Sequence, residues 1–99
     1  MMERLNGQQR ISKECILKNS KGLHARPATI FVQTALSFRS EISVCNLRNE
    51  MTGDGKSVMS MLMLAAPCGT PIRITASGAD SEQAVETLYR LLEQEFDDD

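Results

Sequence analysis

The 99-residue sequence has no tryptophan, few other aromatic residues and only one histidine. It also lacks a basic excess, because 11 lysines and arginines face 13 aspartates and glutamates. RNA-binding modules of small α+β type use exposed aromatic side chains on a sheet together with positive charge. All the aromatic residues here fall in segments with helical spacing, namely Phe31, Phe38, Tyr89 and Phe96. We therefore expect no binding to nucleic acid.

Long apolar runs and paired cysteines are absent as well. No apolar run approaches the roughly 20 residues of a membrane-spanning helix, and no stretch resembles a signal peptide. Cys15, Cys45 and Cys68 are odd in number and widely spaced, and one histidine cannot complete the usual Cys/His zinc site. We expect a soluble, cytoplasmic protein with no membrane insertion, no metal and no bound cofactor, whose thiols are reduced packing residues.

What the chain does contain suffices for one small domain. Its hydrophobic content of 41% allows a modest core. Residues 1–12 are polar without a clear period, so we expect a flexible N-terminal extension there. The domain itself is expected to span residues 13–96, and residues 97–99 form an acidic tail.

Alternating apolar and polar residues predict four strands, at residues 13–18, 41–47, 51–52 and 71–76. In the first strand, Cys15 and Leu17 share one face and Ile16 lies on the other. Apolar residues spaced by three and four predict three helices, at residues 25–38, 57–64 and 80–96. We expect Ser57 to cap the second helix, and Asp80 with Gln83 to cap the third. The order β-α-β-β-α-β-α predicts a two-layer α+β domain with the helices over one face of the sheet.

The only histidine, His24, stands in the run Gly22–Ala28 (GLHARPA), where an extended segment gives way to a helix. Pro27 supports this placement, because proline is tolerated in the first helical turn. Imidazole, with an unperturbed pKa of about 6.5, is a good nucleophile near pH 7. The helix N-terminus favours phosphoryl oxygens, and Arg26 adds a planar donor fork. The pattern predicts a shallow, exposed site that accepts a phosphoryl group reversibly.

The same run resembles the active-site signature of the HPr family, the histidine-containing phosphocarrier proteins of the bacterial phosphotransferase system. The segment Lys56–Met59 is similar to the regulatory-serine motif of that family, and Ile74–Asp80 is similar to its last strand and helix cap. The three motifs follow the order of the family across residues 12–96. The resemblance implies an open-faced β-sandwich, with a four-stranded antiparallel sheet covered by three helices on one face.

The resemblance also implies the roles of individual residues. His24 would accept the phosphoryl group on Nδ1, Arg26 would bind phosphate, and Ser57 would be the serine that an HPr kinase/phosphorylase modifies in some bacteria. Four residues match the surface of the family that docks enzyme I and the enzyme IIA domains: Ala25, Val58, Met59 and Leu62. The implied protein is a monomeric carrier that takes phosphate from enzyme I, which is charged by phosphoenolpyruvate, and delivers it to enzyme IIA.

The branch of the family stays open at this point. The apolar run Leu62–Leu64 and the acidic ending at residues 95–99 are similar to the nitrogen-regulatory paralogue, whereas Lys56 and Ser57 are closer to the sugar carrier or to a kinase-regulated form. The alternative function is therefore a regulatory phosphocarrier that controls other proteins without sugar transport. Because a short helix cannot bury every face, we expect Met59 and Leu62 to be exposed.

Overall fold

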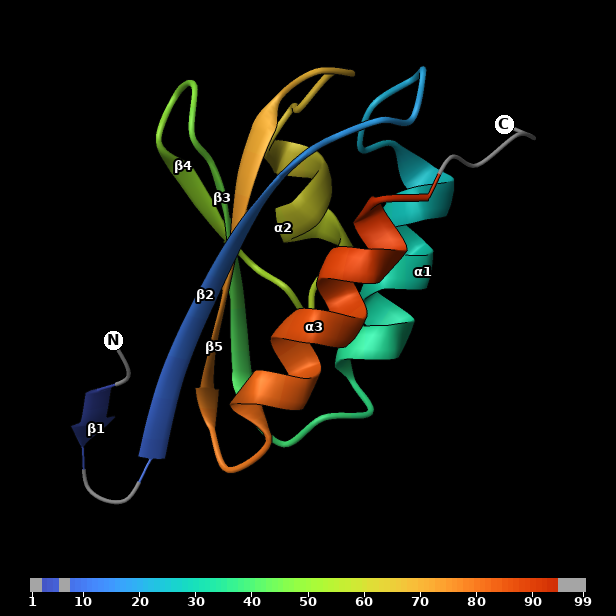
Figure 1. Ribbon diagram of the computed structural model, residues 1–99. Coiled ribbons are helices and arrows are strands. Elements are labelled where there is room, and N and C mark those ends of the chain that lie inside the picture. The colour runs from blue at the N-terminus through green and yellow to red at the C-terminus, as the bar shows by residue number, and fades with distance from the viewer. Residues whose placement is uncertain (1–2, 6–7, 95–99) are drawn as a thin grey trace.

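The computed structural model describes residues 3–5 and 8–94, and places three helices over one face of a five-stranded antiparallel sheet (Figure 1). The sheet has the order β1-β2-β5-β3-β4. Its strands are β1 (Glu3–Leu5), β2 (Gln8–Ile16), β3 (Glu41–Asn46), β4 (Met51–Asp54) and β5 (Pro71–Gly78). The helices are α1 (Ala25–Ala35), α2 (Val58–Met63) and α3 (Ser81–Leu92). The predicted two-layer α+β architecture is confirmed.

The N-terminal part differs from the flexible extension that we expected over residues 1–12. Strand β2 begins at Gln8 rather than at residue 13, and it pairs with β5 from Gln9 opposite Gly78 onward. The short strand β1 pairs with β2 and adds a fifth strand to the four expected. The sequence hides this extension because Ile11 is the one apolar residue between Gln8 and Ser12. The expected acidic tail at residues 97–99 lies outside the described residues.

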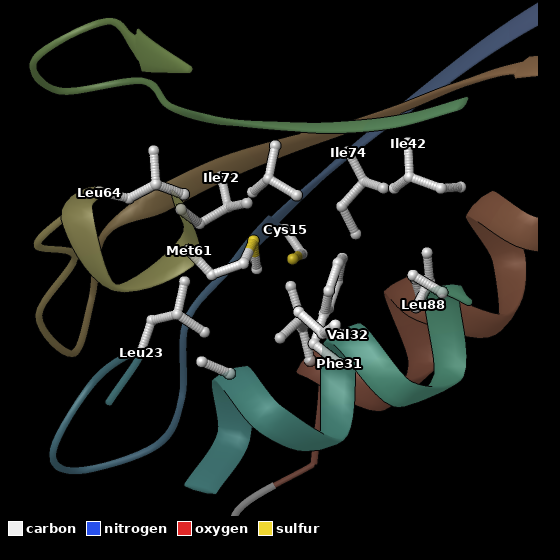
Figure 2. Packing of buried hydrophobic residues seen from close by; sticks show 14 of the residues in the cluster. Cys15, Leu23, Phe31, Val32, Ile42, Met61, Leu64, Ile72, Ile74 and Leu88 are labelled. Carbon is white, nitrogen blue, oxygen red and sulfur yellow. The ribbon is translucent and has the colours of Figure 1, made fainter. Parts of the chain in front are cut away.

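The core lies between the sheet and the helices, and the alternation along the strands determines which side chains enter it. In β2, Cys15 is buried while Ile16 is 49% exposed, as predicted. The buried residues of β3 and β5 also alternate, and include Ile42, Val44, Ile72 and Ile74. Phe31 of α1, Met61 of α2 and Leu88 of α3 join them from the helical layer (Figure 2). Full burial of such a side chain stabilises the fold by about 1.5–3 kcal/mol.

Asp80 precedes α3 as predicted, but its carboxylate does not cap that helix. It accepts hydrogen bonds from the backbone N–H groups of Arg39 and Ser40, both at 2.9 Å, and from the Ser40 hydroxyl at 2.6 Å. These hydrogen bonds, that of the Ser40 hydroxyl first, lower the pKa of Asp80. Gly78, with φ +149°, allows the close approach, since a Cβ there would lie 2.8 Å from Cα of Ser40. The carboxylate thus joins the α1–β3 loop to the start of α3.

The outer face of α3 carries charged side chains that reach back to the end of β2. Glu86 pairs with Lys13 at 2.9 Å and with Arg90 at 2.8 Å. Lys13 also lies 4.2 Å from the centre of the Tyr89 ring. These partners are exposed, so each pair contributes little to stability. Their main effect is to give α3 a polar outer surface.

Candidate functional site

His24 is the N-cap of α1, at the boundary that the sequence predicts. Its backbone is extended, with φ −102° and ψ −164°. Its carbonyl accepts a hydrogen bond from the N–H of Ala28 at 3.0 Å, and its own N–H donates to the carbonyl of Gly22 at 3.1 Å. The imidazole does not cap the helix. The ring is therefore placed at the positive end of the helix dipole by backbone hydrogen bonds.

One ring nitrogen of His24 is closed to solvent. The residue as a whole is half-buried, and its Nε2 atom is buried. A nucleophile must reach the phosphorus of its donor, which a buried nitrogen cannot do. Nε2 therefore cannot accept a group from another protein in this arrangement.

The other predicted residues of this site lie on the first turn of α1. Ala25 and Arg26 are both exposed. Pro27 is buried, and its lack of an N–H group is harmless at this position. The chain thus presents an exposed arginine two residues after the histidine, in the first turn of the helix.

The loop that leads into His24 is bound to the segment that follows α2. The N–H of Leu17 donates to the carbonyl of Thr70 at 3.0 Å, and the N–H of Gly69 donates back to Leu17 at 2.8 Å. Closer to the site, the N–H of Leu23 donates to the carbonyl of Ala66 at 2.9 Å. The side chain of Leu23 is buried in the core (Figure 2). The position of His24 therefore depends on contacts with a segment more than forty residues away in the sequence.

Gly22 makes this close approach of the two segments feasible. Its φ of +72° lies in the left-handed region, which favours glycine. A Cβ at this position would overlap the carbonyl oxygen of Ala66 and lie 2.7 Å from Cα of Pro67. Any other residue would push the two segments apart, and Leu23 would lose its hydrogen bond.

Ser57 is the N-cap of α2, as predicted, and its hydroxyl accepts a hydrogen bond from the N–H of Ser60 at 3.2 Å. Helix α2 ends where its chain meets the His24 loop, and Ser57 lies at the other end (Figure 1). Six residues of α-helix separate the two ends by roughly 9 Å. The structure therefore does not bring Ser57 next to the imidazole.

The exposed face of α2 is apolar. Met59 is 69% exposed and Leu62 is 39% exposed, as we expected, whereas Val58 is half-buried. Met63, at 63% exposed, belongs to the same surface and is missing from the prediction. Helical geometry could have found it, because Met63 stands about 200° around the helix from the fully buried Met61.

Other features of the described residues lie apart from His24. A hollow of about 630 Å³ includes Arg10, Ser43, Asp54 and Thr75 among its lining residues, but none of the predicted site residues. In residues 3–5 and 8–94, no three histidine, cysteine, aspartate or glutamate side chains are grouped to hold a metal ion. The helices of this part of the chain are all too short or too polar to cross a membrane.

Residues 11–94 match a family model described as the PTS HPr component phosphorylation site. The phosphocarrier protein HPr of Neisseria meningitidis serogroup A is 42% identical over 78 residues, which cover 79% of this chain and 85% of that protein. A crystal structure of a phosphocarrier protein HPr from Bacillus anthracis superimposes with a TM-score of 0.78 and 35% identity. That match covers 84% of this chain and 96% of the other.

A larger protein contains a similar segment. The multiphosphoryl transfer protein of Escherichia coli O157:H7 is 42% identical over 81 residues, which cover 79% of this chain. The chain spans only about a fifth of that relative, because the match covers 21% of its length. The similarity to this relative therefore concerns one part of it.

Proposed function

The chain belongs to the HPr family of the phosphotransferase system, and on that premise we propose that it accepts a phosphoryl group on Nδ1 of His24 from phosphorylated enzyme I. It then passes the group to a histidine of an enzyme IIA domain. The carrier works as a monomer in the cytoplasm. It is a covalent intermediate in a relay and does not turn over a substrate of its own.

The observation that carries this proposal is the placement of His24 at the helix start, with Nε2 buried. In the uptake step, the lone pair of Nδ1 attacks the phosphorus of the phosphohistidine on enzyme I. A new N–P bond forms while the N–P bond of the donor breaks, and the imidazole of the donor leaves with the electron pair. In delivery, His24 is the donor: a ring nitrogen of the enzyme IIA histidine attacks the phosphorus, a new N–P bond forms there, and the N–P bond of His24 breaks. Such a transfer needs positioning and charge neutralisation rather than further covalent chemistry.

The test is incubation of the protein with enzyme I and phosphoenolpyruvate, followed by analysis of the bound phosphate. We expect one phosphate that is labile in acid and stable in base, and its absence in His24→Ala. A phosphate of this kind that persists in His24→Ala would contradict the proposal. Circular dichroism and urea unfolding of the variant provide the control for its fold.

Arg26 binds the transferred phosphate in this proposal, which its exposed position on the first turn of α1 supports. Removing one positioned donor from a phosphoryl-transfer site slows the reaction by about 10²-fold. We assign a loss of this size to Arg26→Ala. Arg39→Ala is the matched control, because Arg39 is exposed beyond the other end of α1 and binds Asp80 through its backbone only.

Ser57 is the proposed site of regulation by an HPr kinase/phosphorylase. A phosphate there would add a charge of about −2 to the helix that carries the exposed apolar side chains. That charge would weaken the docking of a phosphorylated partner. Mass spectrometry after incubation with the kinase and ATP tests this assignment, with Ser57→Ala as the control. Phosphate found on Ser60 instead would move the site by one helical turn.

The apolar end of α2 favours the regulatory alternative, in which the phosphate controls other proteins without sugar transport. Met59, Leu62 and Met63 give this helix a strongly apolar outer surface. Transfer assays with enzyme IIA domains of the sugar type and of the nitrogen type separate the two candidates. Faster transfer to the nitrogen type would support the regulatory role.

A further inference from the structure

Asn19 is a polar residue in an almost fully buried position, with only 4% of its surface exposed. A buried amide is costly unless its polar atoms are hydrogen-bonded. Its side-chain Nδ2 donates to the carbonyl oxygen of Gly22 at 3.1 Å. A backbone hydrogen bond links the same two residues in the reverse direction, since the N–H of Gly22 donates to the carbonyl of Asn19 at 2.8 Å. Asn19 therefore closes the turn that leads into His24.

The carbonyl that Asn19 binds is the same one that holds His24. The N–H of His24 donates to Gly22 at 3.1 Å, so the oxygen uses its two lone pairs for Asn19 and His24. The opposite end of this peptide group is the N–H of Leu23, which donates to Ala66 at 2.9 Å. The peptide plane between Gly22 and Leu23 is thus fixed from both sides, directly before the proposed phosphate acceptor.

We propose that Asn19 is a positioning residue for the imidazole of His24. The proposal rests on the phosphocarrier function proposed above. Asn19 holds the orientation of the Gly22–Leu23 peptide, and this orientation sets the direction in which the chain enters α1. Because phosphoryl transfer depends on the alignment of acceptor and donor, a small tilt of the ring slows the reaction. The docking surface on α2 is not part of this turn.

The test compares Asn19→Ala with Ser40→Ala in the assay with enzyme I and phosphoenolpyruvate. Both substitutions remove a side-chain hydrogen bond from a buried polar residue, and Ser40 lies beyond the opposite end of α1. We expect kcat for phosphorylation of Asn19→Ala to fall about tenfold with KM for enzyme I unchanged. Ser40→Ala keeps the kcat and KM of the wild type although it is less stable.

Asn19→Leu is the second variant, because it keeps most of the buried volume and lacks the donor. Its folded state remains available for measurement if Asn19→Ala does not fold. The NMR signals of the His24 ring provide a second measurement, since a changed ring environment shifts them in Asn19→Leu but not in Ser40→Ala. Unchanged ring signals together with a wild-type kcat would overturn the positioning role.

The outcomes separate this inference from the proposed function. If the wild-type protein acquires no acid-labile phosphate, the carrier function fails and the role of Asn19 fails with it. If the wild type is phosphorylated and both Asn19 variants have the same kcat as the wild type, Asn19 is structural only and the carrier function stands. A rise of KM without a fall of kcat would assign Asn19 to docking and would also contradict the inference.

Discussion

Helices α2 and α3 cover the same face of one sheet, but their outer surfaces are opposite in character. Helix α3 buries Leu88 and exposes charged residues such as Glu86 and Arg90, which pair with each other, and Glu86 also pairs with Lys13 of β2. Helix α2 buries Met61 and exposes Met59, Leu62 and Met63. The charged surface of α3 is well solvated, whereas the surface of α2 leaves large apolar side chains in contact with water.

The difference shows which helix the fold alone can explain. Exposed ion pairs contribute little to stability, and exposed apolar side chains contribute nothing through burial. The charges of α3 are what any soluble domain requires on its outside. The apolar side chains of α2 have no such explanation within the domain, and the docking surface that the family resemblance implies would account for them. The segment that follows α2 is hydrogen-bonded to the loop that carries His24.

A leucine-to-alanine substitution in each helix should give the largest difference between α2 and α3, measured as the loss of unfolding free energy. Leu88→Ala in α3 removes a fully buried side chain and should lower the free energy of unfolding by about 2–5 kcal/mol. Leu62→Ala in α2 should lower it by less than about 1 kcal/mol, because Leu62 is 39% exposed. Urea denaturation followed by circular dichroism measures both. Equal losses in the two variants would mean that the side chain of Leu62 contributes as much to the core as that of Leu88.

The buried Cys15 and the exposed Cys68 should differ in their reactivity toward thiol reagents. Burial raises the pKa of Cys15, in the core, to about 11, and the negative charge of Glu93 at the end of α3 adds to the rise. The pKa rises from a reference value of 9.0, so the thiolate fraction of Cys15 at pH 8 is lower by roughly 100-fold than that of an unperturbed thiol. Cys68, exposed in the segment after α2, should react first with a thiol reagent. Peptide mapping by mass spectrometry would reveal the reverse order.

Transfer from enzyme I should sharpen the comparison on the functional side. The double substitution Met59→Ser with Met63→Ser should reduce kcat/KM about tenfold through a higher KM, since two lost apolar contacts together need to cost only about 1.4 kcal/mol for that change. The matched change on α3, Glu86→Gln with Arg90→Gln, should leave the transfer rate unchanged. Steady-state kinetics measure both. A larger effect from the α3 pair would move the docking surface to that helix.

Asp80 should give the smallest of these effects, at the junction that precedes α3. Its hydrogen bonds favour the ionised carboxylate, so the pKa of Asp80 is lower in the folded than in the unfolded protein. The resulting stability is present above pH of about 4 and is lost as the pH falls through the folded pKa. Asp80→Asn should cost about 1 kcal/mol at pH 7 and weaken the acid dependence. Urea midpoints at pH 7 and pH 3 for both proteins test this expectation.

Sequence periodicity located the elements because local patterns determine them. The spacing around Phe31 and Val32 marks α1, and the alternation around Ile72 and Ile74 marks β5. The sequence predicts β2 too short, because its first residues have no alternating apolar pattern. They join the sheet by pairing with the end of β5. The start of a strand that depends on a distant partner leaves little trace in its own residues.

The sequence predicts the reactive residues of the candidate site, but it does not predict the hydrogen bonds that hold them in place. His24, Arg26 and Ser57 stand in short local motifs, and the structure places His24 and Ser57 at helix starts as expected. The hydrogen bond from Leu23 to Ala66 joins distant segments, and no local motif indicates it. The carboxylate of Asp80 is a similar case, because its partners near Ser40 compete with the local cap.

The contact that Gly22 permits has a consequence for the motions of the protein. The amides of Leu17, Leu23 and Gly69 take part in one set of bonds between two segments. The loop before His24 and the segment after α2 can separate only if these hydrogen bonds all break. The amide hydrogens of Leu17, Leu23 and Gly69 should therefore give one common free energy of opening in hydrogen exchange, as a single cooperative unit. That shared opening would set the upper limit on how often the imidazole leaves the orientation in which it can react.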